Sequence, residues 1–497
     1  MAKTKLFDLI SSLSMSEKRF FKLFSERHVI GSENEYVLLF DLIDKMISYD
    51  DSEVKNAPFV KNASAEKNYL YRLILKSLNS FHAQNSTKNK IYNSLVSIEI
   101  LFQKGLYDQS LELIEKTKKL AKDNELFKQL LSLNEIEQEV LLKSLKYKDA
   151  LNEMEKEQET INQVLELRDI GMLTTKAYYE NLTIGIARSE KQLDQYKQLL
   201  ISQKRRKGSL SKRAELHKLS FQMTYDMIAG KHQQVINKSS SMIAFYEKHP
   251  YLIEYTPVGY VSVNFIYGAA LRQNKMFKDG YEQIYKLEEI ANQIVVKKSQ
   301  KAHAFAVFYK HILYHQLLYL EKRYSDGLKL YAQTKEEIGT HINFIEKPQL
   351  YDLYFQLAKL FFMLGKHDLS LDYTNLILND TSFKDRDDFS IGIRLFNIIT
   401  HFELGNEFTS EYLSRSSVAY FRRKNKLYKT EKIILSFLQN YAKYEFDGSL
   451  VNKGKEILQS FNTLKKHPFE KGAFRFFAFD QWIIRLIPDI EKDPDAH

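Results

Sequence analysis

The chain of 497 residues contains no cysteine, only 17 glycines and only 7 prolines. The absence of cysteine excludes disulfide scaffolds, thiolate–zinc and iron–sulfur sites, and cysteine nucleophiles. Glycine and proline make up about 3% and 1% of the chain, against roughly 7% and 5% in average proteins. Multi-stranded sandwiches and barrels need a turn every ~10 residues, so this shortage excludes them. With 44% hydrophobic and 13% aromatic residues, the chain can still bury a large core.

Long hydrophobic runs are also missing. Near the N-terminus, Leu6 and Phe7 are followed at once by Asp8, whereas a signal peptide needs an apolar stretch of ~7–15 residues. The most apolar stretch, residues 476–487, contains charged side chains and is too short to span a bilayer. We therefore expect a cytoplasmic protein without a membrane partner.

The motifs of several enzyme classes do not occur in the sequence. Neither Gly-x-x-x-x-Gly-Lys-Ser/Thr nor Gly-x-Gly-x-x-Gly is present, which excludes the nucleotide enzymes that use those two phosphate-binding loops. The nucleophile elbow Gly-x-Ser-x-Gly is also absent. We expect a protein that is not an enzyme and that holds no cofactor.

One group of histidines has a spacing that metal sites use. His311 and His315 are four residues apart and share a helical face, with His303 two turns upstream. A metalloprotease needs glutamate directly after the first histidine, and here that position is Ile312. Tyrosines surround the pair, which indicates a packing face, so we expect no metal site.

Positive charge is concentrated in one part of the chain. Between residues 197 and 238, ten basic and two acidic side chains leave a local charge of +8 out of a net +10. A second cluster, at 422–429, follows Tyr420 and Phe421 and interleaves aromatic with basic residues, as single-stranded nucleic-acid binders do. Such patches attract phosphates or acidic surfaces, although both clusters also fit solvated loops or helix faces. The candidate patch residues are Lys204, Arg205, Arg206, Lys207, Lys212, Arg213, Arg422, Arg423 and Lys424.

Helical periodicity runs through most of the chain. From residue 59 to residue 249 there is no proline, and apolar residues recur at i, i+3, i+4 and i+7. Alternation typical of a strand is scarce. Its best case, residues 260–265, continues into Gly268-Ala269-Ala270-Leu271, which favours a helix. The sequence therefore predicts an all-α fold.

A short pattern repeats along this helical chain: a polar or glycine turn, an aromatic or similar residue, two polar positions and a usually small residue. The aromatic positions are 40, 46, 39, 45, 47, 43 and 41 residues apart. The turn would reverse the chain, the aromatic residue would wedge between two helices, and the small residue would let their backbones approach. The eight aromatic positions are Tyr107, Tyr147, Leu193, His232, Phe277, Tyr324, His367 and Phe408.

These copies resemble the tetratricopeptide repeat over roughly residues 90–445. In that family, glycine and tyrosine mark the turn between paired helices, and alanine follows three residues later. The period here is ~43 instead of about 34, so helices or loops must be longer, and the family's tryptophan and closing proline are missing. The resemblance implies a right-handed superhelical solenoid of about eight antiparallel helix pairs with helical caps. The matching pairs of positions are Tyr107/Ser110, Tyr147/Ala150, Tyr324/Gly327 and His367/Ser370.

Both terminal segments lack the repeat, so residues 1–88 and 446–497 are predicted to cap a repeat region at 89–445. The N-terminal segment is expected to form helices at about 4–30, 34–48 and 64–82, with Ser14 to Glu17 as a capping box and Ser64 as a further cap. A DNA-recognition helix near residues 62–72 is the alternative, but residues 1–90 carry a charge of only +3. Residues 469–487 are dense in large apolar side chains and predict a final sealing helix, with a membrane-surface helix as the alternative.

These patterns together predict a non-catalytic interaction scaffold or adaptor that binds a peptide or protein segment on a concave face. The alternative is a nucleic-acid- or ribosome-associated regulatory protein that uses the clusters at 204–213 and 422–429. The first helix of each pair would supply the contact row in the scaffold. The expected contact residues are Asn264, Tyr267, Arg272, His311, Tyr314, His315, Tyr354 and Lys359.

Overall fold

The computed structural model describes residues 5–26, 34–84, 86–204, 211–380, 383 and 387–490. In these ranges the chain forms 25 α-helices, three short 3-10 helices and no strand. The predicted all-α fold is confirmed. Within the same ranges, no helix has both the length and the apolar character required to cross a bilayer.

The chain divides into two compact units, residues 1–164 and 165–497, and the boundary falls inside helix α9. This boundary lies within the predicted repeat region, and the three-part division at 88 and 445 stays a prediction. Unit 1 contains α1 (Lys5–Ser11), α2 (Met15–Glu26), α3 (Glu35–Asp44), α4 (Asp51–Asn56), α5 (Ala63–His82), α6 (Thr87–Gln103), α7 (Tyr107–Asp123), α8 (Phe127–Lys143) and the first part of α9 (Tyr147–Ile184).

Unit 2 contains the rest of α9 and all later elements. Its helices up to residue 363 are α10 (Glu190–Lys204), α11 (Lys212–Ile228), α12 (His232–Lys248), α13 (Pro250–Tyr255), α14 (Pro257–Gln273), α15 (Phe277–Asn292), α16 (Ile294–Lys297), α17 (Gln300–Leu320), α18 (Tyr324–His341), η1 (Ile342–Phe344) and α19 (Lys347–Met363). The remaining elements are α20 (His367–Leu378), α21 (Asp387–Glu403), α22 (Glu407–Arg423), α23 (Lys429–Phe446), α24 (Leu450–Leu464), η2 (Lys471–Arg475), α25 (Phe479–Leu486) and η3 (Pro488–Ile490).

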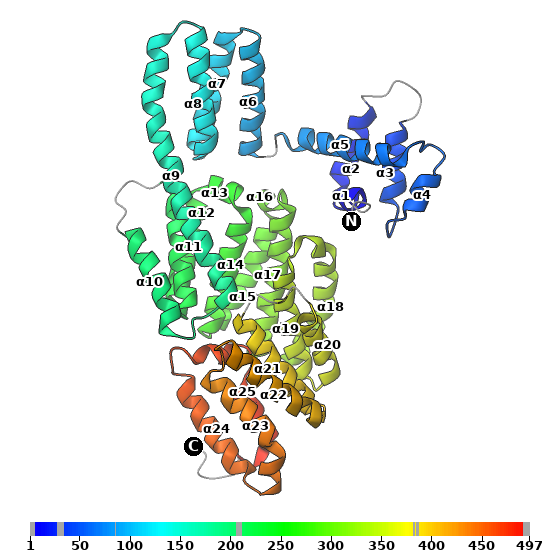
Figure 1. Ribbon diagram of the computed structural model, residues 1–497, viewed down its shortest axis with the longest axis vertical. Coiled ribbons are helices and arrows are strands. Elements are labelled where there is room, and N and C mark those ends of the chain that lie inside the picture. Colours follow the sequence, from blue (N-terminus) through cyan, green and yellow to red (C-terminus); the bar gives the residue numbers. More distant parts are fainter. Residues whose placement is uncertain are drawn as a thin grey trace. The chain divides into compact units, whose positions relative to one another are not determined.

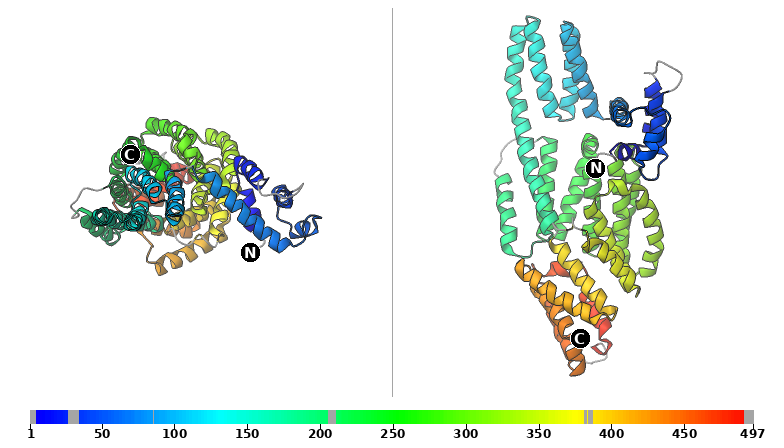
Figure 2. Two further views of the ribbon diagram at one scale, coloured as in Figure 1. Left: turned by 90° about the horizontal axis from the view of Figure 1, so that it is seen from above. Right: turned by 45° about the vertical axis from the view of Figure 1, so that its right-hand side comes forward.

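The helices of unit 2 pack largely in chain order. The pairs α11/α12, α14/α15, α17/α18, α19/α20 and α21/α22 are in contact, and α14, α17 and α19 also pack on one another in succession. Figure 1 shows these pairs lying side by side from green to yellow, with α22 to α25 gathered at one end of the unit. The same grouping is seen after rotation (Figure 2). A right-handed superhelix stays a prediction.

The repeated pattern marks turns between helices. Six of the eight predicted aromatic positions are the first residue of a helix: Tyr107, Tyr147, His232, Phe277, Tyr324 and His367. Two residues before each of them, the backbone takes a left-handed conformation, as at Gly365 with a φ of 72°. The amide of Lys366 then donates to the carbonyl of Phe361 at 2.9 Å, which is the bond that closes a Schellman motif. The motif therefore ends one helix and starts the next.

The small residue of the pattern allows close packing, as expected. A Cβ added at Gly327 would lie 2.8 Å from Leu360 Cδ1, and one at Gly280 would lie 3.1 Å from Leu317 Cδ2. The aromatic residue does not wedge between helices in every copy, because Tyr147 is exposed and Phe408 is 91% exposed.

In the other two copies the aromatic position is not the first residue of a helix. In the weak copy, α10 begins at Glu190, three residues before Leu193. In the last copy, α22 begins at Glu407, one residue before Phe408.

The N-terminal segment forms more helices than predicted. The expected helix at 4–30 is interrupted, because Ser14 caps α2: its amide donates to Glu17 Oε2 at 2.7 Å, and the Glu17 amide donates back to Ser14 Oγ at 3.3 Å. The capping box is thus confirmed. Asn62, and not Ser64, caps α5 by accepting from the amide of Ala65 at 3.1 Å. The short helix α4 was not predicted.

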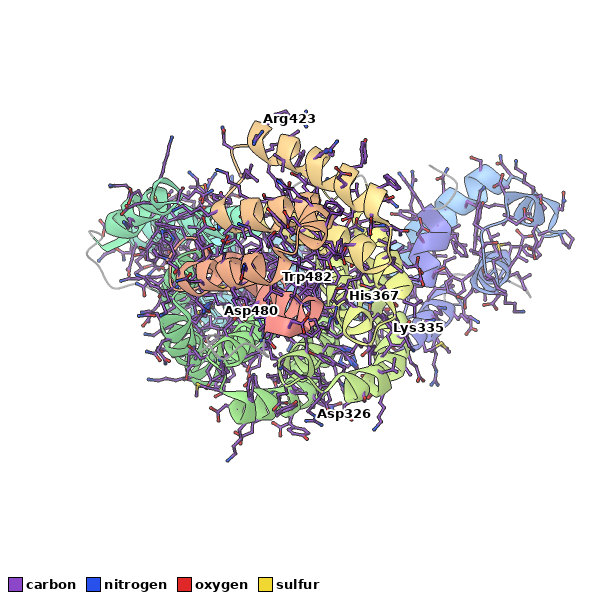
Figure 3. The ribbon with its side chains drawn as sticks, turned by 90° about the horizontal axis from the view of Figure 1, so that it is seen from below. Asp326, Lys335, His367, Arg423, Asp480 and Trp482 are labelled. Atoms are coloured by element: carbon purple, nitrogen blue, oxygen red, sulfur yellow. The ribbon has the colours of Figure 1, made fainter. Side chains whose placement is uncertain are left out.

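The C-terminal segment folds back into the core of unit 2. It forms η2 and α25 in place of the single predicted helix. Phe476 and Phe477 belong to a core shared with α19, α21 and α23, and a Cβ at Gly392 would lie only 2.6 Å from Phe476 Cγ. The single tryptophan, Trp482, is buried in the same core and donates to Glu403 Oε1 at 2.7 Å. Figure 3 shows Trp482 among the C-terminal helices.

Candidate functional site

Unit 2 encloses a cavity of about 310 Å³ among its stacked helices. The walls come from the end of α9, from α11, α12, α14, α17, α19 and α21, and from the C-terminal segment around η2. Elements more than 200 residues apart in the sequence therefore meet around one space, with Tyr178 at one end of the range and Phe476 at the other.

A buried ion-pair network holds the C-terminal segment in place beside the cavity. The Arg188 guanidinium, in the loop after α9, donates to both oxygens of Glu431 at 2.9 and 3.1 Å and to Glu470 at 3.0 Å. It also lies 4.1 Å from the centre of the Tyr428 ring. Glu470 accepts a second bond from the Thr430 hydroxyl at 2.9 Å. These contacts join the α9–α10 loop, the start of α23 and the residue before η2.

Two cations in the cavity, Lys359 and Arg272, form no hydrogen bond or close ion pair with a described residue. Lys359, on α19, is 5% exposed, and its ammonium lies 4.7 Å from the ring centre of Tyr319 and 5.1 Å from that of Phe355. The Lys359 ammonium makes no other close contact with a polar or aromatic group of a described residue. Arg272, on α14, has a buried Nε without a hydrogen-bond acceptor. Arg475, from η2, adds a third positive charge to the lining. Buried charges are normally paired, so the absence of a close partner for Lys359 and Arg272 is unusual.

The cations perturb one another. Burial, together with the charges of Arg272 and Arg475, lowers the pKa of Lys359 to about 7, and only Asp352 opposes this effect. Burial and Arg475 lower the pKa of Arg272 to about 10. Burial, with help from the same cations, lowers the pKa of His232 to about 4, so its imidazole is neutral at pH 7. The lining thus brings three basic side chains and the carboxylate of Asp352 close enough to shift pKa values in the cavity.

Three glutamine side chains add unsatisfied amides to the same cavity. The Oε1 atoms of Gln316, Gln349 and Gln356 are buried and have no hydrogen-bond partner in the described structure. Each carboxamide offers both a donor and an acceptor to a ligand. Between these polar groups the wall is largely aromatic, and it includes Phe265 and Tyr309, whose stacked ring centres are 4.2 Å apart.

A second cavity, of about 360 Å³, lies next to the first. The two share the lining residues Tyr178, Asn181, Met227, Ser262 and Ile266. The second is largely apolar and includes Arg213, whose guanidinium lies 3.6 Å from the Tyr255 ring centre. Unit 2 therefore holds two neighbouring cavities, and Arg272, Lys359 and Arg475 all line the first.

The structure brings two of the predicted contact residues together, and three others take part in the packing between helices. Arg272 and Lys359 both line the first cavity. Tyr267 packs against the core of α12 to α17, Tyr314 contacts Tyr281, and Tyr354 contacts Tyr373 with ring centres 5.9 Å apart. A continuous contact row along the first helices stays a prediction.

The remaining three predicted contact residues are buried between helices. His311, at 1% exposure, lies 2.9 Å from Glu337 Oε2, and His311 and His315 approach the Thr334 hydroxyl at 3.0 and 2.9 Å. Asn264 is also buried and bonded within its helix pair. These side chains offer no surface to a partner. Among the described residues no cluster of three or more potential metal ligands occurs.

The residues of the two basic clusters differ in their exposure and in their contacts. Arg205, Arg206 and Lys207 lie outside the described residues, as does the side chain of Lys204. Lys212 pairs with Glu215 at 3.1 Å, and Arg213 is buried in the second cavity. Arg422, Arg423 and Lys424 are exposed at the end of α22, where Figure 3 shows Arg423 at the periphery.

Most of the other polar residues that line the cavity belong to no pattern that points to a binding site. Arg475 lies in a segment without the repeat, and the three glutamines belong to no motif. Lys359 is the exception, because a basic residue among apolar neighbours such as Leu357 and Leu360 indicates a buried charge. In comparisons with known proteins, no family model matches this chain, and no curated protein matches it at a significant level.

Proposed function

We propose that this protein is a non-catalytic interaction protein that takes up a segment of a protein partner in the cavity of unit 2. The observation that carries the proposal is the set of buried polar groups that no described residue satisfies. It consists of Arg272 Nε and the amide oxygens of Gln316, Gln349 and Gln356, and beside them the buried Lys359 places its ammonium against the rings of Tyr319 and Phe355. An unsatisfied buried group costs about 1–3 kcal/mol, so such a concentration in one cavity is typical of a site that a ligand completes.

The shape and chemistry of the space favour an extended ligand. Carboxamide side chains complement the donors and acceptors of a peptide backbone. The two cavities lie next to each other, and aromatic walls such as the Phe265–Tyr309 stack suit the apolar side chains of a peptide.

A cavity-filling substitution tests this proposal. Ala269 lines the first cavity, so Ala269→Phe should block it, whereas Ala419→Phe adds the same bulk at an exposed position of α22. Full-length wild type and both variants would be applied to an array of random-sequence peptides, and hits would be measured in solution. We expect hits that bind wild type and Ala419→Phe alike and lose at least about tenfold in affinity to Ala269→Phe. Hits that bind all three proteins equally would contradict a ligand in this cavity.

Nucleic-acid or ribosome binding is the second candidate, and the exposed cations of α22 favour it. The guanidinium groups of Arg394 and Arg423 lie 4.8 and 5.8 Å from the ring centre of Tyr420, an aromatic–basic surface on which a base could stack. Recovery of nucleic acid with the protein would be compared before and after nuclease treatment. Charge reversal at Arg422, Arg423 and Lys424, and separately at 204–207, should abolish recovery and its salt dependence if this candidate is correct.

A further inference from the structure

Lys359 places a buried amine at the wall of the first cavity of unit 2. The side chain is 5% exposed, and its nitrogen lies 4.7 Å from the ring centre of Tyr319 and 5.1 Å from that of Phe355. It forms no hydrogen bond or close ion pair with a described residue. A lysine that supports a fold from the interior is normally paired, so this amine is better suited to contact a ligand.

The surroundings of this amine favour its neutral form. Burial removes water from the ammonium, and the charges of Arg272 on α14 and Arg475 on η2 repel it, which lowers the pKa of Lys359 to about 7. Asp352, on the same helix as Lys359, opposes these effects. About half of the amine is therefore uncharged at pH 7, whereas an ordinary lysine is almost fully protonated. Burial and a neighbouring cation activate lysines that attack carbonyl groups in the same way.

Arg272 supplies a complementary group in the same cavity. Its Nε is buried without an acceptor, and none of its N–H groups is bonded to a described residue. N–H donors near a carbonyl oxygen stabilise the negative charge that develops there when a nucleophile attacks the carbon. Because the charge of Arg272 acts on Lys359, the two groups are near each other. The cavity therefore combines an amine nucleophile and a donor for a carbonyl oxygen, from two different helices.

The rest of the wall indicates what the carbonyl group is attached to. The rings of Phe265, Tyr309, Phe355 and Phe476 line the cavity, and the first two are stacked with their centres 4.2 Å apart. A volume of about 310 Å³ is within the range of small-molecule sites. An aromatic aldehyde would present a flat ring to these walls. Its carbonyl carbon bears a single substituent and stays open to attack in an enclosed space.

We propose that Lys359 is a covalent attachment site for an aromatic aldehyde, with Arg272 donating to the carbonyl oxygen and the ring held against the aromatic wall. The neutral amine attacks the carbonyl carbon, and the carbonyl oxygen takes up a proton. The nitrogen then loses a proton, the hydroxyl group takes one up and leaves as water, and a C=N bond forms. The step is reversible and involves no oxidation or reduction. This inference goes beyond the proposed function, because the ligand is a small molecule bound through a covalent bond.

Reductive trapping with benzaldehyde tests the site in the full chain. Limiting benzaldehyde would be added at pH 7 with cyanoborohydride, which reduces the imine to a stable secondary amine. Mass spectrometry of the digested protein would then locate the label. We expect Lys359 to be labelled at least about tenfold faster than exposed lysines such as Lys335, and Lys359→Met to lose this label. A label spread evenly over the lysines of the chain would overturn the proposal.

Cavity-filling variants separate recognition in the cavity from simple amine reactivity. Ala269→Phe fills the cavity and should slow the labelling of Lys359 at least about tenfold, whereas Ala419→Phe, at an exposed position, should leave it unchanged. Fluorescence of the buried Trp482 would confirm that unit 2 is folded in each variant. Equal labelling of Lys359 in the two folded variants would overturn the proposal.

A variant of Arg272 tests its role beside the amine. Arg272→Gln should slow the labelling of Lys359 and move the pH profile of labelling to higher pH, because Lys359 holds its proton more tightly without this neighbouring charge. Arg415→Gln, at an exposed position of α22, should change neither the rate nor the profile. An unchanged rate and profile in Arg272→Gln would contradict the assigned role.

Peptide binding distinguishes this proposal from the proposed function. Peptides that bind in the cavity, without a preferential label on Lys359, would show that the aldehyde site is wrong while the peptide function stands. Preferential labelling that Ala269→Phe abolishes, without any bound peptide, would leave the aldehyde site standing alone. If both are observed, the trapped protein should bind the peptide at least about tenfold more weakly than untreated protein, because both ligands occupy one cavity. An unchanged affinity would place the label outside the cavity and contradict the proposal.

Discussion

Replacing Lys359 by methionine should stabilise unit 2 in the absence of ligand. In the folded protein the pKa of Lys359 is about 7, against 10.5 for an unperturbed lysine, because the side chain is buried and faces Arg272 from α14 and Arg475 from η2. Asp352, on its own helix, opposes this effect, and Tyr319 from α17 contributes a ring face. Folding therefore costs the energy of discharging or burying this ammonium.

The size of the effect follows from the linkage between protonation and folding. At about 1.4 kcal/mol for each tenfold change, a pKa that falls from 10.5 to about 7 costs the fold about 4 kcal/mol at pH 7 and about 2 kcal/mol at pH 9. The penalty is complete below the folded pKa, where the unfolded chain holds the proton more tightly. It shrinks as the pH rises towards 10.5 and is absent above that value. Water in the cavity would solvate the ammonium, so these figures are upper bounds.

Urea unfolding monitored by fluorescence measures this effect in unit 2 alone, because Trp482 is the only tryptophan and is buried there. We expect Lys359→Met to raise the unfolding midpoint at pH 7, with a gain that falls by about half at pH 9. The control is Lys335→Met on α18, an exposed position that Figure 3 shows at the surface, where the same change should have no such pH dependence. A Lys359→Met protein that is less stable than wild type, or whose gain does not depend on pH, would refute the uncompensated charge.

The same fluorescence assay checks four further expectations. Glu431→Ala removes the partner of the buried Arg188 and should destabilise unit 2 by about 3–5 kcal/mol; a loss under 1 kcal/mol would show that the network does not hold the C-terminal segment. Gly327→Ala places a Cβ 2.8 Å from a leucine methyl and should cost about 1–3 kcal/mol. Gly339→Ala, in the same helix with nothing within 4 Å, should instead gain about 0.5–1 kcal/mol, so equal effects would contradict the packing argument. Lys275→Gly, at a φ of 58°, should relieve about 1 kcal/mol of strain, whereas an unchanged midpoint would show that this turn is unstrained.

Local features of the fold were predictable because they are encoded within a few residues. A residue able to take a left-handed conformation, followed two positions later by a ring, fixes the turn at Gly365 and His367 regardless of distant contacts. The capping box at Ser14 is likewise predictable, because its two hydrogen bonds join residues only three positions apart. In the degenerate copy the helix begins at Glu407, one residue before Phe408, because the left-handed residue of that turn is Gly405.

The cavity was only partly predictable, because its charge arises from segments that meet in three dimensions. The repeat pattern predicts Arg272 and Lys359 as polar contact residues on the first helices of two pairs, but it does not indicate that both line one cavity. The approach of Arg475 depends on the C-terminal segment folding back, and the sequence pattern indicated only a sealing helix there. His311 is predicted as a contact residue on the same grounds as Arg272. In the structure its ring nitrogens instead contact Thr334 and Glu337 within a helix pair.

Calorimetric titration of the intact chain with a peptide selected from the array tests the central claim most directly. We expect one site per chain in wild type and in Ala419→Phe, and a loss of at least about tenfold in affinity in Ala269→Phe, whose added ring fills the cavity. Equal affinity of the peptide for all three folded proteins would contradict a ligand in this cavity of unit 2.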